Sequence, residues 1–180
     1  SIQAKNTAQD ATSKTIAGMS EEGTLSADEF DLTITSQNKQ SNQGQTIATG
    51  TLTLVGTELD LNKSTLQAKN IQLTAAKSID LSYGKAYADN SIAFKADQNA
   101  NLSNGELSAN QIDGLASSIN NTQGSLYANS TITLKQANPN GALTNNSGTI
   151  RSKGLLDISF DTIDNVGKDS LLLSDKAINI

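Results

Sequence analysis

Apolar and small residues alternate in short cassettes that recur along the whole chain. Each cassette has an apolar residue, then a residue of variable size and polarity, then a small residue. Alternation with a period of two is typical of a strand with one buried face. Successive cassettes lie 19 to 24 residues apart, a length typical of one coil of a solenoid. The cassettes begin at Leu25, Ile47, Leu66, Ala86, Leu107, Leu126, Ile150 and Leu172.

Aligning the cassettes gives columns of equivalent positions. We expect the first and third columns to face the interior and the middle column to face solvent, because successive side chains of a strand point to opposite sides. The third column holds the small residues Ala27, Thr49, Ala68, Ala88, Ala109, Ala128, Ser152 and Ser174. The middle column holds Ser26, Ala48, Gln67, Tyr87, Ser108, Tyr127, Arg151 and Leu173.

A second apolar pair follows most cassettes after a short polar corner, as in Ile71 with Leu73 and Ile132 with Leu134. Each repeat is therefore predicted to contain at least two short strands. Several cassettes have a glycine two positions before their first residue, where we expect a corner with φ above zero or too little room for a Cβ atom. These glycines are Gly23, Gly84, Gly105, Gly124 and Gly148.

The repeats predict an all-β fold, a right-handed parallel β-helix of about eight coils. The variable coil length favours the right-handed form, because the left-handed form keeps a stricter coil. We expect residues 1–180 to form a single β-helical segment, with loop insertions at 5–22 and 35–46 that could instead hold a short helix. Neither terminus has a capping sequence, so we expect a segment excised from a longer repeat array, with a tendency to associate end to end.

The composition limits the chemistry that the chain can perform. Histidine and cysteine are absent, and arginine occurs once. We therefore expect no catalytic residues, no cofactor and no metal site. A net charge of −5 without a basic stripe argues against nucleic-acid binding. No apolar run approaches the roughly 20 residues that a membrane-spanning helix needs.

Acidic residues support the main alternative, a carbohydrate-active β-helix enzyme similar to polysaccharide lyases and hydrolases. We interpret these acids as solvated faces, because they alternate with apolar residues and lack convergent basic partners. An ice-binding surface is a more distant alternative, since outward threonine pairs occupy too few coils to form a flat row. The acidic groups are Asp28, Glu29 and Asp31, and Asp157, Asp161 and Asp164.

The most regular repeats run from Asn120 to Ala128 and from Asn145 to Ser152. In each, two asparagines and a short spacer precede a glycine, and alternating apolar and small residues follow. This pattern resembles the repeats of filamentous haemagglutinin-like exoproteins, which Gram-negative bacteria export by two-partner secretion. The resemblance covers most of the chain. It implies a secreted or cell-surface protein in which the chain is the non-catalytic shaft or adhesive segment of an adhesin, a haemolysin-like exoprotein or a contact-dependent growth inhibition toxin.

The same resemblance implies that an outer-membrane transporter is the partner during export, which the chain crosses unfolded. The absence of cysteine suits this route, because a disulfide formed in the periplasm would block threading. The tetrapeptide at 138–141, Asn-Pro-Asn-Gly, is similar to a motif in the family's secretion domain. Proline and glycine at these positions favour a turn, and we predict a turn here.

Partner contacts are expected on the middle column, where Tyr87, Tyr127 and Arg151 are predicted to share one face. Tyrosine and arginine are the residue types that anchor interfaces. The two tyrosines are two coils apart, which corresponds to about 10 Å. We predict that this face contacts a cell-surface receptor or glycan.

Overall fold

The computed structural model describes residues 2–5, 24–27 and 31–180. The secondary structure in these ranges consists entirely of strands, and the strands join in one hydrogen-bonded sheet. They are β1 Ile2–Lys5, β2 Thr24–Ala27, β3 Leu32–Thr35, β4 Lys39–Ser41, β5 Gln45–Ala48, β6 Thr51–Asp60, β7 Thr65–Asp80, β8 Lys85–Ala96, β9 Asn99–Asn101, β10 Glu106–Leu115, β11 Ser118–Asn120, β12 Ser125–Lys135, β13 Ala142–Thr144, β14 Thr149–Ser152, β15 Leu155–Ser159, β16 Thr162–Asp164, β17 Leu171–Ser174 and β18 Ala177–Asn179.

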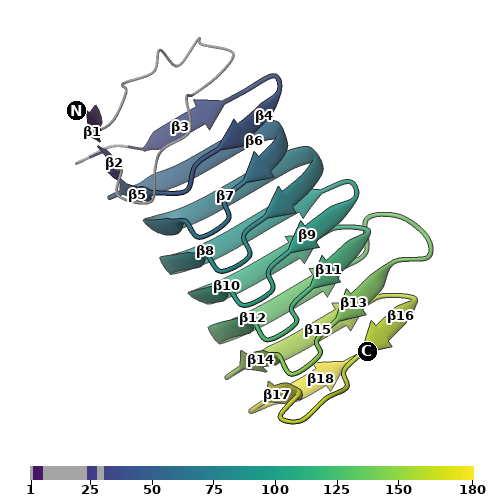
Figure 1. The fold of residues 1–180 in the computed structure, drawn as a ribbon. Coiled ribbons are helices and arrows are strands. Elements are labelled where there is room, and N and C mark those ends of the chain that lie inside the picture. Colours follow the sequence, from purple (N-terminus) through teal and green to yellow (C-terminus); the bar gives the residue numbers. More distant parts are fainter. Residues whose placement is uncertain (1, 6–23, 28–30) are drawn as a thin grey trace.

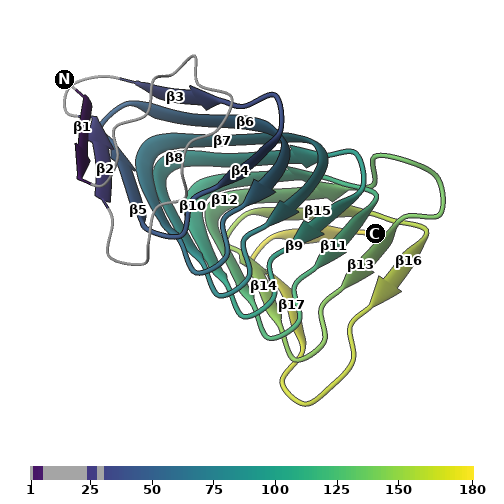
Figure 2. The ribbon, with the colours of Figure 1, turned by 45° about the horizontal axis from the view of Figure 1, so that its top comes forward.

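The strands wind into a parallel β-helix of about seven turns, close to the eight coils predicted (Figure 1). Each coil pairs in parallel with the coils before and after it, while β1 pairs antiparallel with β2. Strands of successive coils lie one behind another, so equivalent residues form ladders along the rod (Figure 2). The parallel β-helix predicted from the repeat spacing is confirmed.

Three faces surround the interior of the β-helix. The first face contains β2, β5, β14, β17 and the opening residues of β7, β8, β10 and β12. The second contains β3, β15, β18, the opening residues of β6, the central part of β7 and the closing parts of β8, β10 and β12. The third contains β4, β9, β11, β13, β16 and the ends of β6 and β7. The sequence predicted at least two strands in a repeat, and the third face supplies a further one.

The register of the first face differs from the prediction in one coil. Leu25 pairs with Thr46, and Thr46 pairs with Leu66, so Thr46 rather than Ile47 occupies the inward column. Ala48 then replaces Thr49 in the small column, and Ile47 replaces Ala48 in the outward column. The prediction failed because it placed the more apolar residue inside.

A polar residue is tolerated at this inward position because it has a partner. The Thr46 side chain is fully buried, and its hydroxyl accepts a hydrogen bond from Nδ2 of Asn42. A buried hydroxyl that keeps a hydrogen bond avoids most of the desolvation penalty. Strand pairing aligns the later positions of the predicted inward column, from Leu66 to Leu172, in the predicted register.

Residues 35–46 form part of a coil, which corrects the expected loop insertion. The segment contains β4 and the start of β5, which pair in parallel with β6 and β7. Its polar residues Gln40 and Asn42 are 1% and 3% exposed and occupy interior positions. An almost wholly polar stretch was therefore mistaken for a loop, although it forms a regular coil. Residues 6–22 of the other expected insertion lie outside the described residues.

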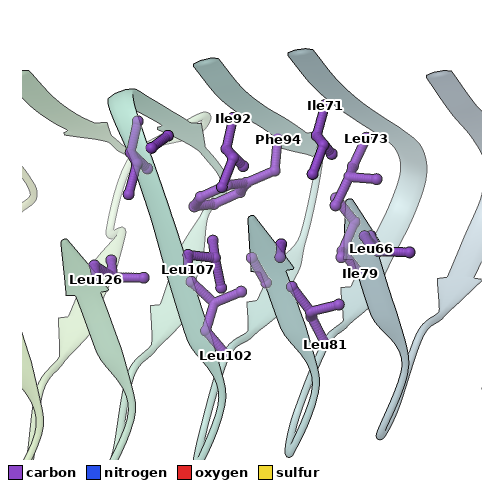
Figure 3. Packing of buried hydrophobic residues seen from close by; sticks show 14 of the residues in the cluster. Leu66, Ile71, Leu73, Ile79, Leu81, Ile92, Phe94, Leu102, Leu107 and Leu126 are labelled. Atoms are coloured by element: carbon purple, nitrogen blue, oxygen red, sulfur yellow. The ribbon is translucent and has the colours of Figure 1, made fainter. Parts of the chain in front are cut away.

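Large aliphatic side chains from the three faces fill the interior (Figure 3). Leu66 and Leu107 come from the first face, Ile71 and Ile92 from the second, and Ile79 from the third. One coil supplies only a few such residues, so the core exists only when neighbouring coils stack. The alternation of large and small inward residues on the first face fits the narrow interior.

Tight turns connect the third face to the first face of the next coil. The residue before each cassette glycine from Gly84 to Gly148 has positive φ, with values of 57° at Tyr83 and 56° at Asn104. A Cβ atom at the following residue, Gly84, would lie 3.0 Å from the carbonyl oxygen of Leu81, and one at Gly124 would lie 2.6 Å from that of Leu102. Of the two reasons predicted for these glycines, lack of room for Cβ is therefore the one that applies to Gly84 and Gly124. Gly23 lies outside the described residues.

Asparagines replace leucines at the inner corner of the later coils. Nδ2 of Asn121 donates to Oδ1 of Asn145 at 2.7 Å, and Nδ2 of Asn145 donates to Oδ1 of Asn165 at 2.7 Å. Asn121 and Asn145 are fully buried. The preceding coil has Leu102 at the equivalent corner, and Oδ1 of Asn121 has no hydrogen-bond partner among the described residues. The amide oxygens of Asn145 and Asn165 thus find their partner in the preceding coil, which the first member of the ladder, Asn121, does not have.

Candidate interaction face

The outward column of the first face brings the predicted contact residues into line. Strand pairing aligns Gln67 with Tyr87, Tyr87 with Ser108, Ser108 with Tyr127, and Tyr127 with Arg151. At the inter-strand distance of about 4.8 Å, Tyr87 and Tyr127 stand about 10 Å apart along the rod. The sequence therefore predicted the alignment of Tyr87, Tyr127 and Arg151 correctly. Their contact with a partner stays a prediction.

Tyr87 is held by the next coil. Its hydroxyl donates a hydrogen bond to Oε2 of Glu106 at 2.9 Å, while the ring is half-buried on the first face. Burial, followed by this hydrogen bond and the negative charge of Glu106, raises the pKa of the Tyr87 phenol. The phenol therefore stays neutral and fixed on the surface at physiological pH.

Tyr127 and Arg151 have their own surface partners. The Tyr127 hydroxyl donates to Oδ1 of Asn129 at 3.2 Å, and Nζ of Lys153 lies 5.8 Å from the centre of the Tyr127 ring. This distance is within the range of a cation–π contact. Arg151 lies 4.0 Å from Oδ1 of Asp175, at the limit of an ion pair. The exposed part of the column thus has the aromatic and charged groups that an interface uses.

A groove runs beside this column at the corner between the first and second faces. Its volume is about 390 Å³. Alanines form the floor, outward residues of the column form one wall, and the corner residues that follow the alanines form the other. Sequence analysis missed the groove, because the corner depends on a register shift between Ala68 and Asn70 that the repeat spacing does not reveal. The lining residues are Ile47, Ala48, Thr49, Gln67, Ala68, Lys69, Tyr87, Ala88, Asp89 and Ser108.

The acidic residues considered for catalysis lie apart and take part in local contacts. Oδ1 of Asp31 accepts from the backbone nitrogen of Thr51 at 2.6 Å, and Asp157 pairs with Lys135 at 3.4 Å. Asp161 accepts a hydrogen bond from the side chain of Gln136, and Asp164 accepts one from Asn146. In residues 2–5, 24–27 and 31–180, acidic side chains do not gather in a group that could hold a metal ion. Asp28 and Glu29 lie outside the described residues.

The tetrapeptide at 138–141 forms the predicted turn. Asn140 has a φ of 63°, and its backbone nitrogen donates to Oδ2 of Asp161 at 2.6 Å. The Asn138 side chain donates to the carbonyl oxygen of Asp97 at 2.9 Å. The turn therefore fastens the loop between β12 and β13 to the following coil and to the coil two before it.

Comparison with known proteins gives one informative similarity. The chain is 32% identical over 156 residues to Toxin CdiA of Yersinia pestis, which covers 86% of this chain. The chain spans only 5% of the length of that relative. Protein-family models do not match the chain, and no solved structure matches it. Within the described residues, no helix is long and apolar enough to span a membrane. The similarity and the β-helix together fit a repeat region of a filamentous haemagglutinin-like, two-partner-secreted exoprotein, the family that the repeats resemble.

Proposed function

We propose that this chain is a shaft segment of a large secreted exoprotein on the surface of a Gram-negative bacterium, and that it does no catalysis. The observation that carries the proposal is the similarity of 86% of the chain to Toxin CdiA, together with a β-helix formed by most of the same residues. A rod of stacked coils holds whatever lies at its ends at a fixed separation, because every coil is fastened to its neighbours by parallel pairing. The name of the relative supports a parent protein that acts in contact-dependent growth inhibition.

We also propose that the segment is adhesive, with Tyr87, Tyr127 and Arg151 contacting a receptor or glycan. Support comes from their alignment on one exposed ladder and from the tendency of Tyr and Arg to anchor interfaces. The outer-membrane transporter of the secretion system is the proposed partner during export. End-to-end association of separate segments is a further proposal, supported by the apolar residues Ile178 and Ile180, which are 43% and 78% exposed in the last described coil.

The test is binding of the purified, labelled chain to whole bacterial and animal cells. A chain with Tyr87→Ser and Tyr127→Ser is the matched variant, and circular dichroism first establishes that both proteins are folded. Saturable binding that the double variant loses would support an adhesive segment. Absence of binding by the folded parent chain would leave a passive rod and refute the adhesive role.

A further inference from the structure

The groove at the corner of the first and second faces runs along the rod. Its floor is the ladder of Ala48, Ala68 and Ala88, whose members come from successive coils. One wall passes through Ile47, Gln67, Tyr87 and Ser108, which are equivalent positions of four coils. Three inter-strand steps make this wall about 14 Å long. A ligand that fills the groove therefore has to be extended and to lie parallel to the rod.

The groove does not suit a protein strand. Strand addition needs a sheet edge with free backbone donors and acceptors. Beneath the groove, β5 pairs with β2 and β7, and β8 pairs with β7 and β10. Recognition here has to come from side chains.

The side chains of the walls suit a carbohydrate. Tyr87 presents a ring whose hydroxyl is tied to Glu106, so the ring is a fixed apolar surface of the kind that packs against the C–H face of a sugar. The side chains of Gln67, Lys69 and Asp89 have no hydrogen bond or ion pair within the described part of the chain. They are exposed and supply donors and acceptors for hydroxyl groups.

The charge of the groove points to an uncharged chain. Lys69 and Asp89 are its only ionisable groups besides the Tyr87 phenol among the described residues, and their charges cancel. A polyanion would need an excess of basic residues, and Glu106 beside Tyr87 would repel it. The groove thus offers no electrostatic attraction to a charged glycan.

We propose that this groove binds an uncharged, extended polysaccharide with β-1,4-linked pyranose rings, lying along the rod. Such a chain advances by nearly the same distance per ring as one inter-strand step of about 4.8 Å, so successive rings meet equivalent side chains of successive coils. Tyr87 packs against one ring, Gln67 and Ser108 bond the rings on either side, and Lys69 and Asp89 bond hydroxyls from the opposite wall. This inference deepens the proposed adhesive function by naming the class of its ligand.

Calorimetric titration of the folded 180-residue chain tests the proposal. The probes are cellohexaose and fully N-acetylated chitohexaose, with shorter members of each series, and maltohexaose as a comparator whose α-linkages coil the chain. We expect at least one β-linked series to bind, with affinity that rises until the oligosaccharide spans the wall and then levels off. Maltohexaose should bind at least tenfold more weakly. Equal binding of maltohexaose, or failure of both β-linked hexasaccharides to bind, would overturn the proposal.

A pair of tyrosine variants locates the site. Tyr87→Ser should weaken binding at least tenfold, whereas Tyr83→Ser, which removes a tyrosine that is 60% exposed in a turn outside the groove, should leave it unchanged. Unchanged binding in Tyr87→Ser would refute the assignment to this groove. If the chain binds cells but neither β-linked hexasaccharide, the adhesive function is retained and this ligand is refuted. If the chain binds a β-linked hexasaccharide but no cells, adhesion is refuted and the groove site is retained.

Discussion

Gly114 and Phe94 form a size-matched pair inside the β-helix, and this pair gives a sharp test of the packing. Both occupy the same inward ladder of the second face, where Gly114 pairs with Phe94 on one side and Leu134 on the other. A Cβ atom at Gly114 would lie 2.3 Å from Cζ of Phe94 and 2.8 Å from Cδ2 of Leu134. The missing side chain therefore provides the space that the phenyl ring fills.

Replacement of the glycine should overpack the core. Gly114 does not have positive φ, so alanine meets no backbone strain and the cost is steric. Overpacking typically costs about 1–3 kcal/mol, and Gly114→Ala should lower the free energy of unfolding by that amount. Phe94→Leu alone leaves a void and should cost roughly 1 kcal/mol or more. The double variant should be more stable than the sum of the two effects, because leucine leaves room for the new methyl group.

Urea unfolding followed by circular dichroism measures each term of this double-mutant cycle. We expect an interaction energy of about 0.5–3 kcal/mol that favours the double variant. Asp113→Ala is the matched control, since Asp113 points outward beside Gly114 and, among the described residues, bonds the side chain of Gln111 alone. Additive effects of the two core substitutions would refute the size-matching argument.

Further predictions concern the register, the turns, the ladder and the surface. Leu126→Asp places a charge in a dry core and should cost roughly 3–5 kcal/mol or more, whereas the outward Tyr127→Asp should be nearly neutral in the same urea titration. Tyr83→Asn should raise the thermal midpoint by about 2–4 °C, because asparagine tolerates the positive φ that Asn104 already adopts. Asn145→Ala should lower the free energy of unfolding by about 1–3 kcal/mol, because the buried Nδ2 of Asn121 loses its 2.7 Å hydrogen bond to Oδ1 of Asn145. Glu106→Gln should lower the pKa of Tyr87, measured by NMR of the ring carbon, yet leave it above its ordinary value because burial is the larger cause. Because folding raises the pKa of Tyr87, the contribution of the Tyr87 phenol to the free energy of unfolding is full below its pKa in the unfolded chain. That contribution is lost as the pH rises through its pKa in the folded chain.

The outward ladder could be predicted from sequence because the later coils obey the cassette pattern closely. From Leu66 onward the apolar and small columns are inward, and Tyr87, Tyr127 and Arg151 fall into line without knowledge of the structure. The first coils could not be placed in this way. There Gln40 and Asn42 occupy interior positions, and a hydrophobicity pattern cannot distinguish a buried polar residue from a loop residue.

The groove could not be predicted, because it depends on backbone geometry rather than residue type. The strand register shifts between Ala68 and Asn70 and again between Ala109 and Gln111, where one face bends into the next. These shifts create the concave corner. Exposed polar residues such as Lys69 and Asp89 have no distinguishing sequence feature until the corner brings them opposite Tyr87.

Inward residues of this rod are constrained by packing and outward residues are not, and this difference indicates which positions can carry a binding function. An inward residue has to match the coils on both sides, as Gly114 matches Phe94 and Asn145 matches Asn121. An outward residue meets no such demand, so the ladders and the groove between them can change from coil to coil while the fold persists. A ligand that contacts several coils at once must then be extended along the rod. Its repeat must be near the inter-strand distance, because equivalent side chains recur only at that interval. Specificity arises where one outward residue differs from the equivalent residues of the adjacent coils. In the groove that residue is Tyr87, which lies between Gln67 and Ser108.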